Sequence, residues 1–289
     1  MICTLCPRRC GALRTEASGN GFCGMPALPV VARAMLHQWE EPCISGSRGS
    51  GAVFFSGCVL GCVFCQNGTI SRGRFGKTVS VPRLREIFHE LIAQGAHNIN
   101  LVSPTPYVPA ILEALAEPLP APVVWNTGGY ERAETLRMLE GKVQIWLPDL
   151  KYADNALARA YSGAADYFET AAAAIREMHR QAGDCVMEDG LLKRGVVIRH
   201  LLLPGALDNA KAVMDWVANT FRPGQVLFSL MAQYTPQPGA EGPLARRVRG
   251  GEYRAAAAYM ENLGITDGYC QDLSSARREY TPAFDLQGV

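Results

Sequence analysis

The stretch Ala52-Val53-Phe54-Phe55-Ser56-Gly57-Cys58-Val59-Leu60-Gly61-Cys62-Val63-Phe64-Cys65 joins a short apolar run to a compact group of thiols. The run at 52–55 is typical of a strand that is covered on both faces. The three cysteines have the spacing Cys-x3-Cys-x2-Cys, so one short loop carries three thiolates. Such a loop can hold three irons of a 4Fe-4S cluster and leave the fourth iron open, as a catalytic centre requires. A structural zinc site and a chance group of buried thiols are the alternatives for Cys58, Cys62 and Cys65.

Outward from this stretch, short apolar runs alternate with amphipathic segments along the rest of the chain. Successive strand–helix units need parallel pairing and right-handed crossovers, so we expect an α/β fold. Six units are most economically arranged as a partial (β/α)6 TIM-like barrel, and a flat doubly wound sheet is the alternative. Either arrangement places the chemistry at the carboxyl ends of the strands. The expected strands cover residues 52–55, 98–102, 123–125, 143–147, 196–203 and 226–231. The expected helices cover residues 82–94, 108–116, 131–139, 167–180, 209–219 and 252–262.

Residues 1–45 do not follow this repeat, and we interpret them as a small Cys-rich metal-binding extension ahead of a core domain at 46–289. Four of its cysteines could enclose a metal completely: Cys3, Cys6, Cys10 and Cys23. The alternatives are an electron-relay 4Fe-4S cluster, which the neighbouring redox chemistry favours, a structural zinc, and free thiols in a mobile tail. Cys43 is a spare candidate ligand. Cys185 and Cys270 stand alone, and we expect them to be buried apolar side chains.

The composition limits the classes of protein to which this chain can belong. Its 289 residues include 28 Lys and Arg and 27 Asp and Glu, which gives a net charge of +1. That balance argues against a strongly basic nucleic-acid-binding protein. A hydrophobic content of 48% is enough for a large core. No apolar run reaches the roughly 18 residues of a membrane span, and the first residues lack a signal-peptide core, so a cytoplasmic protein is expected.

The cysteine spacing and its place after the first strand resemble the radical S-adenosylmethionine (radical SAM) superfamily. Within that superfamily the chain looks most like the pyruvate formate-lyase-activating enzymes, and especially like uncharacterised relatives with an N-terminal Cys-rich segment. Four strand-end motifs carry the resemblance: Asn126-Thr127-Gly128-Gly129-Tyr130, Pro148-Asp149-Leu150-Lys151, Val197-Ile198-Arg199-His200 and Met231-Ala232-Gln233-Tyr234. A fifth stretch, Ser103-Pro104-Thr105-Pro106-Tyr107, departs from the Gly-Gly-Glu-like motif of these enzymes.

The resemblance implies contacts between these strand ends and SAM. Ser103 and Thr105 would contact the amino group of SAM, together with backbone carbonyls. Lys151 would pair with its carboxylate, and Arg199 would lie near its ribose or sulfonium. His200 follows Arg199 on the same strand and therefore faces the other way, as a core histidine.

The resemblance also implies a monovalent cation site and an adenine site. Asp149 and the turn that contains Asn126 and Thr127 would hold the cation beside the SAM carboxylate. Phe64, next to the last cysteine of the motif, and Tyr234 would lie near adenine.

The activity implied by the resemblance is reductive cleavage of SAM at the cluster to a 5′-deoxyadenosyl radical that abstracts a hydrogen atom. The implied substrate is a glycyl radical enzyme, and the implied electron donor is a flavodoxin- or ferredoxin-type protein. Radical modification of another peptide or a small metabolite is an alternative. A second alternative is a non-catalytic Fe-S electron carrier or scaffold. No nucleic acid or membrane partner is expected.

Overall fold

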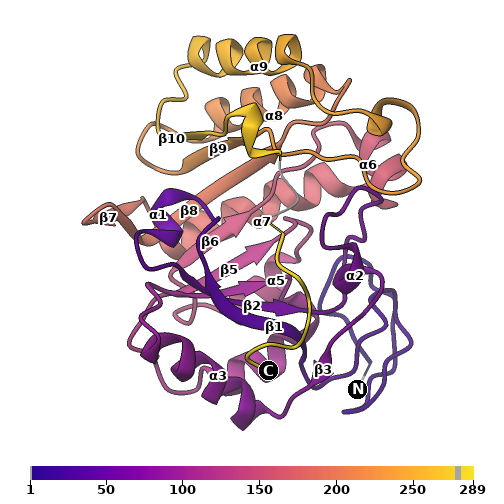
Figure 1. Ribbon diagram of the computed structural model, residues 1–289, viewed down its shortest axis with the longest axis vertical. Coiled ribbons are helices and arrows are strands. Elements are labelled where there is room, and N and C mark those ends of the chain that lie inside the picture. The colour runs from indigo at the N-terminus through magenta and orange to yellow at the C-terminus, as the bar shows by residue number, and fades with distance from the viewer. Residues whose placement is uncertain (1, 277–280) are drawn as a thin grey trace.

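A largely parallel sheet organises the chain in this computed structural model, which describes residues 2–276 and 281–289 (Figure 1). The strand order is β10-β9-β8-β6-β5-β4-β2-β1-β3, and β7 pairs with β8 beside this path. Pairing is parallel from β2 through β10, which confirms the expected α/β fold with a partial barrel. The strands are β1 (Val30–His37), β2 (Ser50–Phe55), β3 (Lys77–Thr78), β4 (Ile99–Val102), β5 (Val123–Thr127), β6 (Ile145–Pro148), β7 (Val186–Glu188), β8 (Leu191–Leu201), β9 (Leu227–Met231) and β10 (Gly268–Cys270).

Helices connect the parallel strands, because each crossover must carry the chain back to the start of the next strand. Their buried residues have helical spacing: α3 buries Leu84, Ile87, Phe88 and Leu91 toward the core. The main helices are α3 (Val81–Ala93), α4 (Val108–Ala114), α5 (Ala133–Arg137), α6 (Asn155–Ser162), α7 (Tyr167–Ala182), α8 (Leu207–Thr220) and α9 (Gly250–Asn262). The shorter ones are α1 (Pro42–Ser45), α2 (Gly68–Ser71), η1 (Thr105–Tyr107), η2 (Gly242–Ala245) and η3 (Leu273–Ser275). Within the described ranges, no helix is long and apolar enough to cross a membrane.

The structure contains elements that the sequence did not predict, among them β3, α6 and β7, and it changes the expected elements in three further ways. First, β1 and α1 lie within the stretch 1–45, and β1 pairs antiparallel with β2, so the last part of the expected extension belongs to the main sheet. Second, β10 adds a parallel strand beyond the six that the apolar runs predict. It was missed because only three residues pair and two of them are exposed. Third, α5 begins at Ala133, because Glu131 turns into the protein interior instead of starting the helix.

The part of the extension before β1 packs on the cysteine loop that follows β2. Arg8 joins the two, since its guanidinium donates to the carbonyl oxygens of Val59 at 2.9 Å and Leu60 at 3.0 Å. The same guanidinium donates to the carbonyl oxygens of Ser162 at 2.6 Å and Gly163 at 2.5 Å, where α6 ends. Arg8 therefore bridges three segments that are distant in the sequence.

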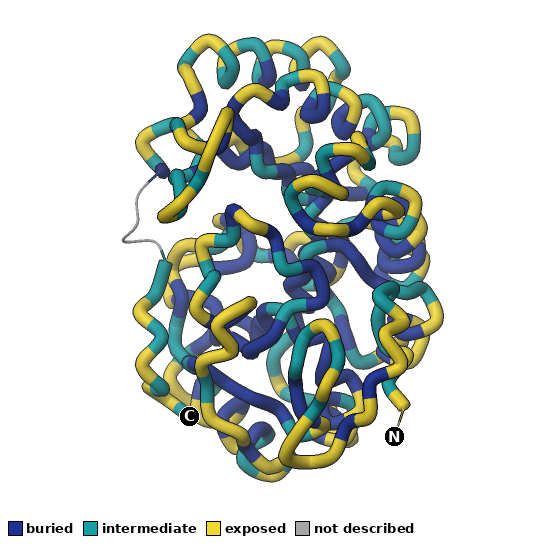
Figure 2. The backbone as a smooth tube through the Cα atoms, turned by 90° about the vertical axis from the view of Figure 1, so that its right-hand side faces the viewer, coloured by how far each residue is buried: buried dark blue, intermediate teal, exposed yellow. Residues whose placement is uncertain are grey.

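Residues 281–289 run along β1, on the side of that strand not covered by β2 (Figure 1). The backbone N–H of Leu286 donates to Ala32 at 3.0 Å, and that of Ala34 donates to Gln287 at 2.9 Å. Phe284 packs edge-on against Phe54 of β2. Figure 2 shows buried segments in the interior and exposed segments mostly on the outside. The C-terminal segment thus pairs with a stretch of β1 that β3 leaves uncovered.

Candidate active site

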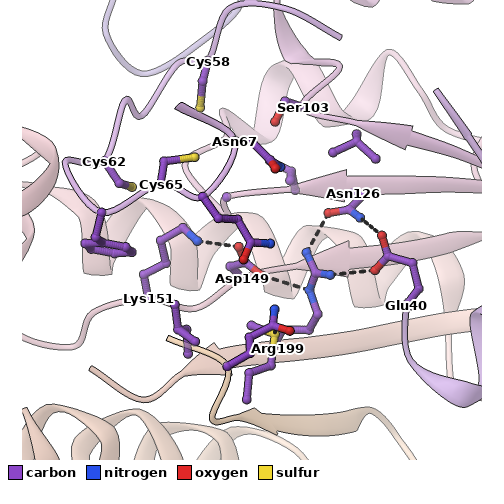
Figure 3. Close-up of a pocket in the computed structure, with 18 of the residues that line it drawn as sticks. Glu40, Cys58, Cys62, Cys65, Asn67, Ser103, Asn126, Asp149, Lys151 and Arg199 are labelled. Atoms are coloured by element: carbon purple, nitrogen blue, oxygen red, sulfur yellow. Dashed lines mark hydrogen bonds and ion pairs between the residues drawn. The ribbon is translucent and has the colours of Figure 1, made fainter. Parts of the chain in front are cut away.

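The carboxyl ends of the parallel strands surround a cavity of about 180 Å³ (Figure 3). Ligand sites of open parallel sheets and barrels lie at this edge. The cavity lining includes all three cysteines of the Cys-x3-Cys-x2-Cys loop and most of the other residues predicted to bind SAM. These residues are Cys58, Cys62, Phe64, Cys65, Ser103, Asn126, Thr127, Asp149, Lys151, Arg199 and Tyr234.

The cysteine loop places its thiols in this cavity. Cys62 is buried, and its Sγ accepts a hydrogen bond from the Ser162 hydroxyl at 3.0 Å. Burial, followed by the neighbouring thiols of Cys62 and Cys65, raises the pKa of Cys58 to about 12. A metal that binds such a thiol deprotonates it outright, so this all-sulfur donor set suits iron. Among residues 2–276 and 281–289, no three Cys, His, Asp or Glu side chains are placed to hold a single metal ion. A cluster does not need that convergence, because each thiolate binds a separate iron.

A buried network centred on Arg199 occupies the opposite side of the cavity (Figure 3). Arg199 Nε donates to Asp149 Oδ1 at 2.9 Å, Nη1 to Glu40 Oε2 at 2.9 Å and Nη2 to Asn126 Oδ1 at 2.7 Å. Asn126 Nδ2 in turn donates to Glu40 Oε1 at 3.0 Å. The three partners come from β5, from the end of β6 and from the segment between β1 and α1. The network therefore fixes three strand ends relative to one another.

Lys151 lies between this network and the cysteine loop. Its Nζ forms an ion pair with Asp149 Oδ2 at 2.5 Å. Burial lowers the pKa of Lys151, but the Asp149 carboxylate and the Cys62 thiol outweigh it and raise the pKa overall. Burial likewise raises the pKa of Asp149, and the charges of Arg199 and Lys151 outweigh it and lower the pKa overall. Both side chains are thus held in their charged forms, and Lys151 can present its ammonium group to an anionic ligand.

Two aromatic rings line the cavity beside the cysteine loop. The ring centroids of Phe64 and Tyr234 are 6.4 Å apart, in an edge-on arrangement. The Tyr234 hydroxyl donates to the Leu244 carbonyl oxygen at 2.6 Å, so the polar end of this residue is satisfied within the protein. Both rings are buried and form part of the cavity wall.

At the end of β4, Ser103 lines the cavity as expected, but Thr105 does not. Ser103 lines the cavity and has a left-handed backbone with φ of 58°, which costs energy in a residue other than glycine. Thr105 is buried away from the cavity, and its hydroxyl donates to Glu131 Oε1 at 2.5 Å. Thr127 donates to the same oxygen at 2.5 Å. Thr105 therefore contacts the support of the β5 turn instead of the cavity.

Three acidic residues near the site were missed by sequence reasoning: Glu40, Glu41 and Glu131. Glu40 and Glu41 come soon after the largely apolar run that forms β1. Two adjacent acidic residues at the end of such a run are a signal that could have indicated them as site residues. The sequence pattern places Glu131 in a helix. Only its burial in the structure shows that it accepts hydrogen bonds from Thr105 and Thr127.

Other expectations concern residues outside this cavity. His200 is buried and its Nδ1 lies 2.7 Å from the Leu150 carbonyl oxygen, which confirms it as a core histidine. Cys43 is buried in a cluster of apolar side chains and lies away from the other N-terminal cysteines. The expectation for Cys270 is wrong: this cysteine is exposed, because the short β10 lies at the sheet edge, and Cys185 is only partly buried. The N-terminal set of Cys3, Cys6, Cys10 and Cys23 lines a second, smaller cavity.

Comparison with known proteins agrees with this fold. An uncharacterised protein of Methanocaldococcus jannaschii is 29% identical over 81% of this chain, and the match spans 66% of that protein. Streptococcus suis SuiB bound to its precursor peptide SuiA has a similar fold, with a TM-score of 0.53, 15% identity, and coverage of 77% of this chain and 49% of SuiB. Methylornithine synthase (PylB) has a TM-score of 0.50, 15% identity, and coverage of 74% of this chain and 68% of PylB.

The profile of the Radical SAM superfamily matches residues 52–217, which is more than half of the chain. The matched region begins in β2 and includes the cysteine loop, Asp149, Lys151 and Arg199. The chain therefore belongs to the radical SAM superfamily, whose members use a 4Fe-4S cluster and SAM for radical chemistry.

Proposed function

We propose that this enzyme abstracts a hydrogen atom from a protein glycine and so activates a glycyl radical enzyme. The observation that carries the proposal is the meeting of the cysteine loop with the Asp149, Lys151 and Arg199 strand ends in one cavity. In the sequence, these strand ends have the pattern of the pyruvate formate-lyase-activating enzymes. Cys58, Cys62 and Cys65 would hold three irons of the cluster and leave one for SAM.

The chemistry that the cluster supplies when bound is one-electron reduction of SAM, which yields methionine and a 5′-deoxyadenosyl radical. The chain's own residues would bind and orient SAM. Lys151 would hold the SAM carboxylate, while Asp149 and Arg199 fix the position of Lys151 and of the β5 turn. Phe64 and Tyr234 would hold adenine against their ring surfaces.

The cavity lining supports a peptide as the substrate. Side-chain amides are concentrated there, from three segments: Gln66, Asn67, Gln233, Gln237 and Gln271. Amide groups both donate and accept hydrogen bonds, as peptide groups do, so they suit an extended polypeptide. A small anionic metabolite would need a further cation, because Lys151 is assigned here to the SAM carboxylate and Arg199 pairs with Asp149 and Glu40.

The first experiment measures SAM cleavage by the protein after anaerobic cluster reconstitution and reduction with dithionite. We expect 5′-deoxyadenosine from the native chain and none from a Cys58→Ala/Cys62→Ala/Cys65→Ala variant. Cys270→Ala is the matched control, because it removes an exposed cysteine outside both cysteine sets. An iron-loaded native protein that forms no 5′-deoxyadenosine would overturn radical catalysis in favour of an electron carrier or scaffold.

The second experiment tests the substrate. Glycyl radical enzymes from the source genome are incubated with the reduced protein and SAM, and the glycyl radical is detected by EPR. A glycyl signal that requires the three cysteines supports the proposal. Cleavage of SAM without any such signal would contradict it and point to another peptide or a small metabolite.

A further inference from the structure

The four N-terminal cysteines come together although two separate turns carry them. Cys3, Cys6 and Cys10 lie on the first turn and Cys23 on the second, and all four line one small cavity. The other side chains around it are mainly apolar, and include Leu5, Met25 and Val59. Among the described residues, neither a carboxylate nor an imidazole belongs to this lining. The donor set is therefore purely sulfur, as in iron–sulfur sites and in zinc sites built from four thiolates.

The backbone around these cysteines is arranged to hold thiolates. The backbone N–H groups of Arg8 and Met25 lie close to the thiols of Cys6 and Cys23. A Cβ at Gly21 would lie 2.9 Å from Cys10 Sγ, so this thiol needs a glycine beside it. Backbone N–H groups near thiolates help to orient metal ligands and stabilise their negative charge.

Positive charge is also present at this cavity. Arg14 is buried, and its Nη1 lies 3.7 Å from Cys3 Sγ. Its guanidinium is fixed by the carbonyl oxygens of Met25 at 3.0 Å and Pro106 at 2.5 Å. A cluster with four thiolates carries net negative charge, which a neighbouring guanidinium stabilises.

This site adjoins the SAM-cleaving loop directly. Val59 lines the N-terminal cavity, while Cys58, the residue before it, lines the main cavity. Gly57 packs against Met25 so closely that an added Cβ would lie 2.1 Å from Met25 Cγ. A redox centre enclosed by four thiolates has no open position for substrate, and so its use here is to carry electrons. This adjacency favours a redox-active cluster over zinc, which has no redox chemistry.

We infer that Cys3, Cys6, Cys10 and Cys23 bind a second 4Fe-4S cluster that passes single electrons to the cluster on Cys58, Cys62 and Cys65. One electron from a flavodoxin- or ferredoxin-type donor reduces the second cluster. The same electron then reduces the SAM-binding cluster and leaves the second one oxidised, and no bond or proton changes place. The relay rests on the proposed function, whereas the site itself does not.

Metal content tests the site without depending on activity. After anaerobic reconstitution with iron, sulfide and equimolar zinc, we expect about eight iron atoms per native chain, as two 4Fe-4S clusters require. The variant Cys58→Ala/Cys62→Ala/Cys65→Ala should keep about four, with the Mössbauer signature of a 4Fe-4S cluster. The variant Cys3→Ala/Cys6→Ala/Cys10→Ala/Cys23→Ala should also keep about four, and Cys270→Ala about eight.

Zinc bound to the triple variant in place of iron, or no metal in that variant, would overturn the site. The triple variant decides this even if the quadruple variant fails to fold, because it leaves the N-terminal set intact. A loaded triple variant together with a native protein that cleaves no SAM would instead refute the proposed function and leave the site standing.

The relay is tested by EPR on the quadruple variant. Dithionite should still reduce its remaining cluster, whereas a reduced flavodoxin should reduce it more slowly than in the native protein. Equal rates of reduction by flavodoxin in the two proteins would refute the relay.

Discussion

Arg199 is the residue on which the buried charges of the site depend. It pairs with Asp149 and Glu40 at 2.9 Å each and lies 3.8 Å from Glu41. Its own side chain is only 13% exposed, so solvent would not replace its charge. The place of Arg199 in an apolar strand predicts that its charge needs a buried partner or ligand, but only the fold identifies Glu40.

Replacement of Arg199 should therefore destabilise the fold. Arg199→Met leaves three acidic groups facing one another, and we expect a loss of about 3–5 kcal/mol in the free energy of unfolding. Urea unfolding under anaerobic conditions measures it. Arg247→Met is the control, because Arg247 is exposed, and it should change stability little. Equal losses in the two variants would contradict the role of the network.

Glu131 gives the stability a dependence on pH. Burial raises its pKa from 4.5 to about 7, against the hydrogen bonds from Thr105 and Thr127. The folded chain thus holds this proton more tightly than the unfolded chain. The resulting stabilisation is complete below about pH 4.5 and is lost as the pH rises through about 7.

Glu131→Gln should remove this dependence, since a neutral amide keeps the oxygen that both threonines need. The variant should gain about 2 kcal/mol over the native protein between pH 5.5 and pH 8. Unfolding by urea across that range measures the difference, with the exposed Glu113→Gln as control. Parallel curves for native protein and Glu131→Gln would show that the carboxyl is ionised throughout.

At the scale of elements, the ends of β5 and β6 approach each other through Gly129. This glycine has φ of 78°, and a Cβ there would lie 2.2 Å from the Asp149 carbonyl oxygen. Gly141 has φ of 76°, and an added Cβ would meet no atom within 4 Å. Alanine at either position would be strained by the left-handed backbone. Only at Gly129 would its Cβ also collide with a neighbouring atom.

Alanine at these two glycines separates strain from crowding. We expect Gly141→Ala to cost about 1–2 kcal/mol through strain alone. Gly129→Ala should cost about 1–3 kcal/mol more, because the carbonyl of Asp149 must move. It should also weaken SAM binding, measured by calorimetry on the reconstituted protein. Equal losses of stability in the two variants would mean that the β5 turn can move to accommodate the added methyl group.

The elements were predictable to different extents, for physical reasons. Continuous apolar runs such as the one in β5 identify buried parallel strands, because both faces are covered. The sequence did not predict β1, because this strand is antiparallel and Arg33 interrupts its apolar run. The strand-end motifs predicted which side chains face the cavity. The displacement of Thr105 into a hydrogen bond with Glu131 depends on contacts between η1 and the β5 turn, which spacing does not encode.

At the scale of the whole molecule, Arg8 joins the N-terminal cysteine segment to the barrel. Its guanidinium also lies 4.0 Å from the centroid of the Phe22 ring, which adds a cation–π contact. Both cysteine sites therefore share one structural support. Sequence reasoning treated the extension as a separate unit, because no periodicity links Arg8 to the segments that it contacts.

Loss of Arg8 should loosen the cysteine loop. Arg8→Gln cannot reach all four carbonyl groups, so hydrogen–deuterium exchange should rise across residues 57–65 and the melting temperature should fall. Arg9→Gln is the matched control, because the neighbouring side chain is exposed. Unchanged exchange in Arg8→Gln would show that the loop is held by packing alone.

The contact of Arg8 with Gly163 spans 155 positions of the sequence. During synthesis on the ribosome, the cysteine loop leaves the exit tunnel well before its partner at the end of α6 exists. The thiols of Cys58, Cys62 and Cys65 therefore stay accessible to cellular oxidants until translation has passed α6. Assembly of a cluster on these three cysteines would consequently follow the synthesis of roughly the first half of the polypeptide.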